Sequence, residues 1–102
     1  MLKLAIDFDG TIHDYKNPVK GKRMGEPIEG AKQALSRHRM LGYKVIIHSV
    51  WGYKDNIIGD WMKFYGIPYD EITNIKPQAD YYIDDKAIRF NNNWKEIIKI
   101  TK

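Results

Sequence analysis

The sequence predicts an α/β fold, a three-layer sandwich around a small parallel sheet, and two observations indicate it. Three short apolar runs, at residues 2–6, 43–47 and 79–83, each have the length of a strand and are followed by polar residues or glycine. Such runs are typical of parallel strands buried on both faces. Segments with apolar residues at helical spacing separate the runs, and this alternation is typical of right-handed α/β units.

Two helices are predicted between the apolar runs. Residues 27–41 carry apolar side chains at helical spacing, with Pro27 suited to the first turn and Gly42 to the position past the end. The pattern repeats at residues 57–65 and closes at Gly66. We therefore expect both segments to be helices that connect neighbouring parallel strands.

Two shorter elements are predicted in the second half of the chain. Residues 69–73 suit one more brief strand. Asn93, followed three residues later by Glu96, resembles the reciprocal cap of a last helix that reaches Ile100.

The long non-helical piece is residues 12–26. Its turn residues and its place directly after Asp9 predict a flap-like loop over the strand ends, because loops of this length usually have a function or are disordered. The segment is also basic, and its cations either attract a polyanion or keep the loop solvated. These cations are Lys16, Lys20, Lys22 and Arg23.

Length and composition narrow the class of protein. A chain of 102 residues suits one domain, residues 1–102, with no cap domain, so a lid must be a short loop or a neighbouring subunit. The absence of cysteine excludes disulfides, cysteine zinc sites and thiol nucleophiles. No apolar stretch approaches the roughly 18 residues that span a membrane, so we expect a cytoplasmic protein. The net charge of +4 favours phosphorylated or polyanionic partners, or simply serves solubility.

The first apolar run ends in two carboxylates, Asp7 and Asp9, followed by Gly10. Two residues apart at the end of an extended segment, both carboxylates can face one small volume. They repel each other unless a cation lies between them or one is protonated, and phosphoryl transfer through an aspartyl-phosphate uses both arrangements. The alternative is that Asp-Gly is only a turn dipeptide after a strand.

Polar residues also adjoin the other predicted strands. Ser49 follows the second run and offers a hydroxyl that can hold a phosphate oxygen. Asp84 and Asp85 follow the third run, and adjacent carboxylates favour a magnesium site built with Asp7. Lys76 precedes that run and carries a charge that can neutralise Asp7. Taken alone, Ser49 could equally be a turn residue and Lys76 a surface residue. It is the occurrence of these residues together with the carboxylates that indicates a phosphate site.

This set of residues resembles the haloacid dehalogenase (HAD) superfamily of phosphohydrolases. Its four signatures match residues 7–11, then Ser49 after an apolar strand, then Lys76 and Pro77, then residues 84–85, in that order. The resemblance implies a Rossmann-like, HAD-type sheet. Within the superfamily, an Asp at the position of Asp9 is typical of phosphatases and phosphomutases, whereas transport ATPases carry Thr there, so the resemblance points to hydrolysis of phosphomonoesters.

The resemblance assigns a role to each matching residue. Asp7 would be the nucleophile and a ligand of Mg²⁺, and Asp9 the general acid and base, with its backbone carbonyl also on the metal. Asp84 would be a direct metal ligand and Asp85 an outer-shell or orienting one. The residues that bind the transferring phosphoryl group would be Gly10, Thr11, Ser49 and Lys76.

Two features depart from the family pattern. Many members carry a further Asp soon after the paired carboxylates, whereas residues 86–89 supply none, which leaves the contact of Asp85 with the metal open. The segments after Thr11 and Ser49 are too short for the usual cap domains. Members without a cap accept macromolecular or exposed phosphates, or borrow a lid by forming homo-oligomers.

We therefore expect a magnesium-dependent phosphomonoester hydrolase that works through an aspartyl-phosphate on Asp7. Its substrate would be a phosphorylated small molecule or a polynucleotide end. The alternative is a catalytically silent HAD-fold module that binds phosphate or regulates a partner. His13, His38 and His48 form no metal-binding spacing and are interpreted as structural.

Overall fold

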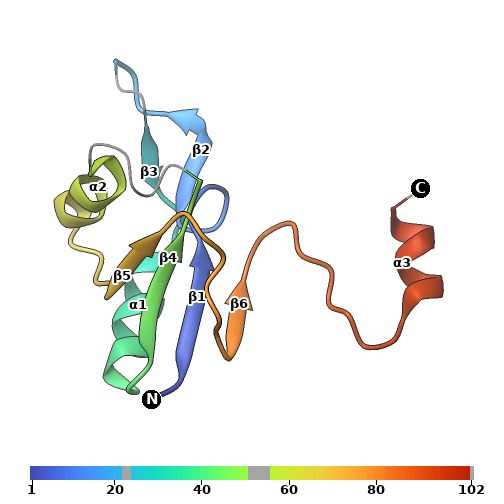
Figure 1. Ribbon diagram of the computed structural model, residues 1–102. Coiled ribbons are helices and arrows are strands. Elements are labelled where there is room, and N and C mark those ends of the chain that lie inside the picture. The colour runs from blue at the N-terminus through green and yellow to red at the C-terminus, as the bar shows by residue number, and fades with distance from the viewer. Residues whose placement is uncertain (22–23, 51–55, 102) are drawn as a thin grey trace.

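The structure is a computed structural model that describes residues 1–21, 24–50 and 56–101. It has helices beside a small parallel sheet (Figure 1), which confirms the predicted α/β class. The strands are β1 (Lys3–Asp7), β2 (His13–Pro18), β3 (Gly25–Pro27), β4 (Lys44–His48), β5 (Glu71–Thr73) and β6 (Tyr81–Ile83). The helices are α1 (Ala31–Met40), α2 (Ile57–Tyr65) and α3 (Trp94–Ile100).

The main sheet has the strand order β5-β4-β1-β6, and all its pairs are parallel. Ile6 of β1 lies opposite Ile47 of β4 and Ile83 of β6. Because the strands run the same way, their carboxyl ends meet at one edge of the sheet, which is where ligands bind in open α/β folds.

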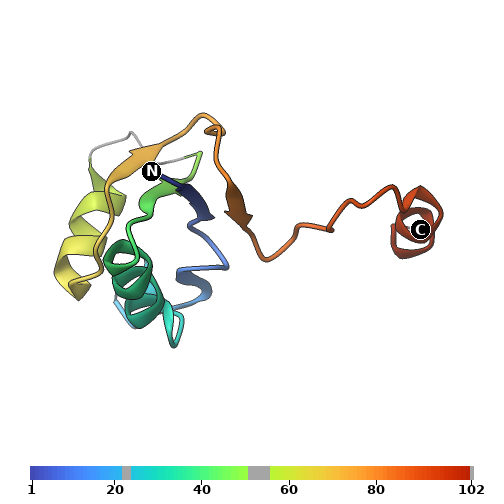
Figure 2. The ribbon, with the colours of Figure 1, turned by 90° about the horizontal axis from the view of Figure 1, so that it is seen from below.

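The apolar core lies between one face of this sheet and helices α1 and α2, which both lie on that side (Figure 2). Side chains alternate between the two faces of a strand, so Leu4 and Ile6 of β1 point into this core. Leu35 of α1 and Met62 of α2 pack against them and are buried. Helix α1 begins at Ala31 rather than at Pro27, because Gly30 has a left-handed φ of 92° that a helix does not accommodate.

The opposite face of the sheet is covered by the crossover between β5 and β6, residues 74–80. Ala5 pairs with Tyr82 in register, so both point to this face. The Tyr82 hydroxyl accepts a hydrogen bond from the Ala79 N–H (3.1 Å) and donates one to the Pro77 carbonyl (2.7 Å). Within the described residues no helix packs on this face, so the helices of the sandwich, α1 and α2, lie on one side of the sheet.

Residues 12–26 contain two antiparallel strands, β2 and β3, so the prediction of a loop is wrong there; residues 22 and 23 lie outside the described ranges. The residues of β2 are mostly polar and lack the alternation of apolar and polar side chains that predicts a strand. Its extended conformation depends instead on contacts with the rest of the fold. Gly25 lies so close to β2 that a Cβ would overlap the Asp14 carbonyl. Its own carbonyl accepts a hydrogen bond from the Trp61 Nε1–H at 3.0 Å, which ties the hairpin to α2.

Two expectations about the last elements also need correction. All three residues of β6 are exposed rather than buried, because β6 is an edge strand that no described helix covers. The side chains of Asn93 and Glu96 do meet, because Asn93 Nδ2 donates a hydrogen bond to the Glu96 carboxylate at 3.4 Å. The Asn93 side chain makes no capping bond to the backbone of α3, however, so the predicted reciprocal cap does not form at this described helix. Nowhere in the described ranges is there a helix with the length and apolar character needed to cross a membrane.

Candidate functional site

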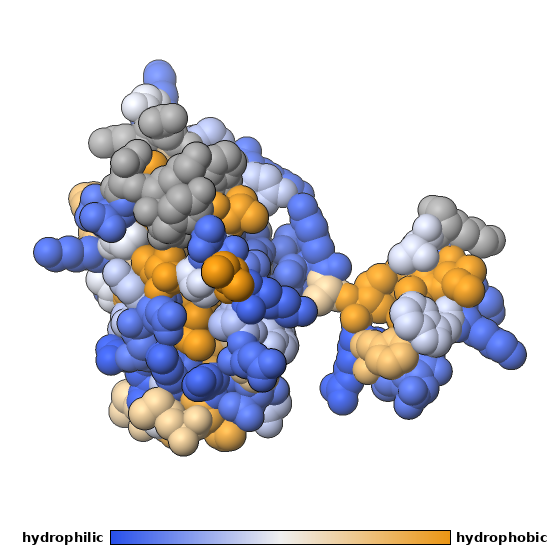
Figure 3. Space-filling model, in the orientation of Figure 1, coloured by the Kyte–Doolittle hydropathy of each residue, from blue (hydrophilic) through white to orange (hydrophobic). Residues whose placement is uncertain are grey.

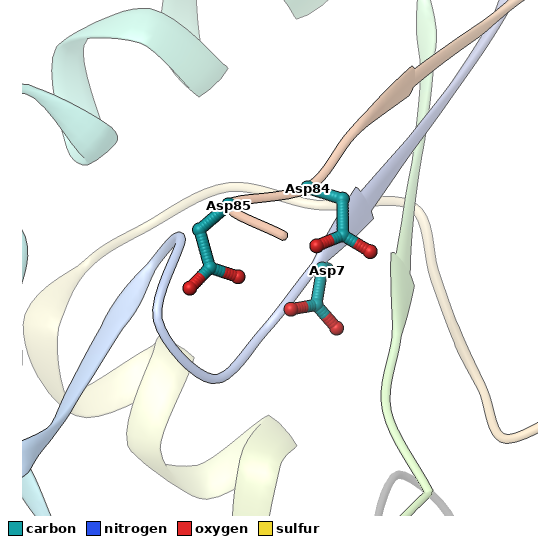
Figure 4. A group of neighbouring side chains, drawn as sticks. All are labelled: Asp7, Asp84 and Asp85. Atoms are coloured by element: carbon teal, nitrogen blue, oxygen red, sulfur yellow. The ribbon is translucent and has the colours of Figure 1, made fainter. Parts of the chain in front are cut away.

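Three carboxylates gather at the carboxyl edge of the sheet. Asp7 is the last residue of β1, and Asp84 and Asp85 follow β6, its neighbour. One ligand oxygen from each lies within 4.8 Å of the other two. Figure 4 shows the carboxylates of Asp7 and Asp84 close together, with Asp85 completing the group from the next position along the chain. The donors are hard carboxylate oxygens, which fit Mg²⁺ by their chemistry.

The turn after β1 holds Asp85 in this group. The Asp85 N–H donates a hydrogen bond to Thr11 Oγ1 at 3.2 Å. Gly10 adopts a φ of +85°, and a Cβ at this position would lie 2.5 Å from Asp85 Oδ2. Gly10 therefore serves both the left-handed turn and the close approach of the carboxylate.

Gly10→Ala is expected to lower the free energy of unfolding by about 1 kcal/mol or more through the strained φ. It should also weaken Mg²⁺ binding by roughly tenfold or more, because Asp85 has to move. Denaturant titration and calorimetric Mg²⁺ titration measure the two effects. Gly21→Ala is the matched control, since Gly21 has a φ of +79° but open space where a Cβ would lie. Unchanged Mg²⁺ affinity in Gly10→Ala would contradict the role given to the turn.

The acidic group shifts the ionisation of Asp7. Burial, followed by the charges of Asp84, Asp85 and Asp9, raises the pKa of Asp7 from 3.8 to about 6, and only the opposing charge of His48 lowers it. Without a cation, Asp7 therefore ionises less readily in the folded protein than in the unfolded chain.

This raised pKa predicts a dependence of stability on pH. The folded protein holds the Asp7 proton more tightly than the unfolded chain, so this group stabilises the fold at low pH and the gain is lost as the pH rises from about 4 to about 6. Melting temperatures measured in EDTA across this range should fall less steeply for Asp7→Asn than for the wild type. Mg²⁺ should raise the wild-type melting temperature most above pH 6. Identical slopes for the two proteins would refute the assignment.

Two hollows flank the carboxylates. One, of about 400 Å³, is lined by Asp7, Asp9, Tyr15, Asp84, Asp85 and Lys86. The other, of about 250 Å³, also borders Asp7 and Asp84, and includes the basic side chains of His48 and Lys76. Asp7 thus stands between a hollow lined by four carboxylates and one that also holds Lys76 and His48. Larger hollows of about 600 and 670 Å³ flank α2 and contain none of the predicted site residues.

The predicted phosphate-binding residues are placed differently from one another. Lys76 shares the smaller hollow with Asp7, and its ammonium lies 5.0 Å from the centroid of the Tyr82 ring. Ser49 is buried just past β4, where its N–H donates to the Thr73 carbonyl at 3.0 Å. The register pairs Asp7 with His48, so His48 stands beside Asp7 on the same face.

Asp9 has a partner that sequence reasoning missed. Its Oδ1 lies 2.7 Å from His13 Nδ1, and the Gly25 N–H donates to His13 Nε2 at 2.8 Å. Because Nε2 accepts, the ring proton of neutral His13 resides on Nδ1 and is donated to Asp9. The His13 ring is buried and stacks on the Phe8 ring, with 5.0 Å between the ring centroids.

The only sequence signal for the His13–Asp9 pair was their separation of four residues. That spacing becomes a contact because of the turn, in which the Gly10 N–H donates to the His13 carbonyl at 2.9 Å. His48 had a clearer signal, since it is the last residue of the second strand. Both histidines therefore adjoin the carboxylates, although the sequence interpretation took them as structural.

Comparison with known proteins yields a fold neighbour and no assigned family. No protein-family model matches the chain, and no curated protein matches it. The structure is similar to that of a conserved protein from Bacteroides thetaiotaomicron, with 25% sequence identity and a TM-score of 0.62. The similarity covers 99% of this chain and 92% of the other, so the architecture as a whole has a solved counterpart.

Proposed function

We propose that this protein is a magnesium-dependent phosphomonoester hydrolase that works through an aspartyl-phosphate on Asp7, with Asp9 as general acid and base. The observation that carries the proposal is the position of Asp7 between the two hollows. One side offers carboxylates for a divalent cation, and the other offers His48 and Lys76 for phosphate oxygens. A phosphoryl group attacked by Asp7 needs both kinds of partner.

The metal would be held by the side chains of Asp7, Asp84 and Asp85, and by the backbone carbonyl of Asp9. The geometric support is the 4.8 Å grouping of the three side chains. Bound Mg²⁺ would neutralise charge on the phosphate and so allow an anionic nucleophile to approach it.

The chemistry itself belongs to Asp7 and Asp9. A carboxylate oxygen of Asp7 attacks phosphorus, the bond to the ester oxygen breaks, and the leaving alkoxide takes a proton from Asp9. Water then gives a proton to Asp9 and attacks the same phosphorus, which releases inorganic phosphate and restores the Asp7 carboxylate. The residues that would hold the transferring group are Gly10, Thr11, Ser49 and Lys76.

Asp9 needs a fixed orientation for these proton transfers, and His13 supplies it. The Nδ1–H of His13 binds Asp9 Oδ1, which leaves Oδ2 for the substrate. His13 cannot relay the proton onward from Nε2, because the Gly25 N–H occupies that atom. We therefore assign His13 as a positioning residue.

The site favours exposed phosphate groups. Asp84 and Asp85 are exposed, and the connections after Thr11 and Ser49 are too short for a cap. Tyr15 of the β2–β3 hairpin lines the hollow beside Asp7 and Asp9 and is 41% exposed, so it can contact an arriving substrate. A phosphorylated small molecule or a polynucleotide end satisfies these conditions, and a second subunit would supply any lid.

The test is phosphate release from an aryl phosphate, measured with Mg²⁺ and again with excess EDTA. We expect turnover with Mg²⁺ that EDTA abolishes. Beryllium fluoride, a mimic of the acyl phosphate, should raise the melting temperature only when Mg²⁺ is present. A catalytically silent phosphate-binding module would show the second effect without the first, and would overturn the proposal of hydrolysis.

A further inference from the structure

Residues 86–101, which we call the C-terminal arm, extend away from the rest of the chain (Figures 1 and 2). The structure describes all seven residues of α3, and none of them is buried. The radius of gyration is 14.8 Å, whereas a compact chain of this length has about 13 Å. The arm therefore lies outside the body of the protein.

The arm exposes a cluster of apolar side chains (Figure 3). Phe90, Trp94 and Ile98 are each more than half exposed. The rings of Phe90 and Trp94 lie side by side, with 4.9 Å between their centroids. Trp94 and Ile98 are four residues apart, so they share one face of α3. A helix of two turns is not stable alone in water, and α3 therefore needs a surface to pack against.

Local hydrogen bonds fix the path of the arm at both of its turns. Where the arm leaves the sheet, the Lys86 N–H donates to Asp84 Oδ1 at 2.8 Å. Before α3, Asn93 Nδ2 donates to the Arg89 carbonyl at 3.2 Å, and the Asn91 N–H donates to Asn93 Oδ1 at 2.8 Å. These bonds shape the chain at the two ends of the segment that joins β6 to α3.

The body carries a matching apolar surface, which we call the β6 shelf: Leu2, Tyr81 and Ile83. Tyr81 and Ile83 pair in register with Leu4 and Ile6, so they lie on the face of the sheet that holds the core. Helix α1 packs on β4, and in the described part of the chain no helix covers β6 on that face. The Tyr81 ring meets the edge of the body at Tyr43, with 6.2 Å between the ring centroids. All three shelf residues are exposed.

Charge on the two surfaces is complementary. Asp80 precedes β6, and Asp84 and Asp85 follow it, so acidic residues flank the shelf at both ends. The arm is basic, with one acidic residue, Glu96, against four cations. These cations are Lys86, Arg89, Lys95 and Lys99. Attraction between the carboxylates beside the shelf and the cations of the arm works against the repulsion expected between two copies of a chain with net charge +4.

We propose that α3 of one copy of this chain packs on the β6 shelf of a second copy, and that two copies exchange arms across a two-fold axis. In such a dimer, the apolar face of each α3 packs on the β6 shelf of the other copy, so both surfaces of both copies are covered. A two-fold arrangement closes on itself and stops at a dimer, and exchange of an identical element is a low-cost route to one. This inference does not depend on the proposed hydrolysis.

The mass in solution is the first test. Light scattering on a gel-filtration column should give twice the chain mass of 12.0 kDa for the wild type. The double variant Trp94→Glu/Ile98→Glu should give the mass of one chain, because charges on that face of α3 prevent packing. Lys95→Gln, on the same helix, is the matched control and should remain a dimer. A wild-type monomer, or a double variant that stays dimeric with the wild-type circular dichroism spectrum, would overturn the proposal.

A cross-link distinguishes exchange from closure of the arm onto its own body. The chain has no cysteine, so the pair Ile83→Cys/Ile98→Cys introduces the only thiols. On oxidation, exchanged arms give a covalent dimer on a denaturing gel, and the single-cysteine variants serve as controls. A cross-link within one chain would show that α3 packs on its own shelf and would refute the exchange.

Discussion

Asp7→Asn is expected to reduce the release of phosphate from an aryl phosphate by roughly 10³-fold or more, since an amide cannot replace the attacking carboxylate. The substitution leaves the size of the side chain almost unchanged. It removes a charge that burial and the neighbouring carboxylates disfavour. The variant should therefore be at least as stable as the wild type in EDTA above pH 6, so the loss of activity cannot be attributed to unfolding.

Asp14→Asn is the matched control for this experiment. Asp14 belongs to β2 and accepts hydrogen bonds from the Asn17 side chain at 3.1 and 3.2 Å, and it lines neither hollow beside Asp7. The Asp14→Asn variant loses the same charge as Asp7→Asn, and its turnover should stay within about twofold of the wild type. If the two variants hydrolyse the substrate equally fast, Asp7 is not the nucleophile.

The convergence of the carboxylates could be predicted because it follows from topology. Apolar runs of strand length marked β1 and β6, and the carboxyl ends of parallel neighbours meet at one edge. The sequence analysis expected Asp84 to join Asp7 without predicting the order of the strands, and the structure makes β1 and β6 neighbours. Gly10 was recognisable as a turn residue, although its second role, room for the Asp85 carboxylate, depends on a contact across 75 positions of sequence.

The partners of the carboxylates could not be predicted in the same way, because they depend on register and on a hairpin without a sequence signal. A shift of one residue exchanges the two faces of a strand, and the register at the end of β4 is what places His48 opposite Asp7. His13 contacts Asp9 only because the polar β2 folds back and Gly25 reaches its ring. Neither contact leaves a periodic pattern in the sequence.

The exposure of β6 has a different origin. Tyr81 to Ile83 resembles a buried strand by composition, but burial also requires a neighbouring element, and the chain places α3 outside the body. Apolar composition therefore predicted a buried strand, whereas all three residues of β6 are exposed in a single chain. If arms are exchanged, the expectation of a buried strand is met only in the dimer.

Asp9→Asn is expected to slow steady-state turnover by roughly 10²- to 10⁴-fold, the usual contribution of a general acid or base. The two chemical steps should be affected unequally. An aryl leaving group departs with little help from a proton, so attack by Asp7 continues. Water must still lose a proton in the second step, and the amide that replaces the Asp9 carboxylate cannot accept it. Phosphorylated Asp7 should therefore accumulate.

The signature of this accumulation is a burst of one phenolate per active site followed by a slow phase, and intact-protein mass spectrometry should detect one added phosphoryl group. The asparagine carbonyl can still accept the His13 Nδ1–H, so the turn should keep its geometry. His13→Ala, with Asp9 intact but unsupported, should lower kcat with little change in KM and should give no burst. A slow Asp9→Asn variant without a burst would mean that Asp9 acts before the phosphoenzyme forms, and the role of base would pass to another group.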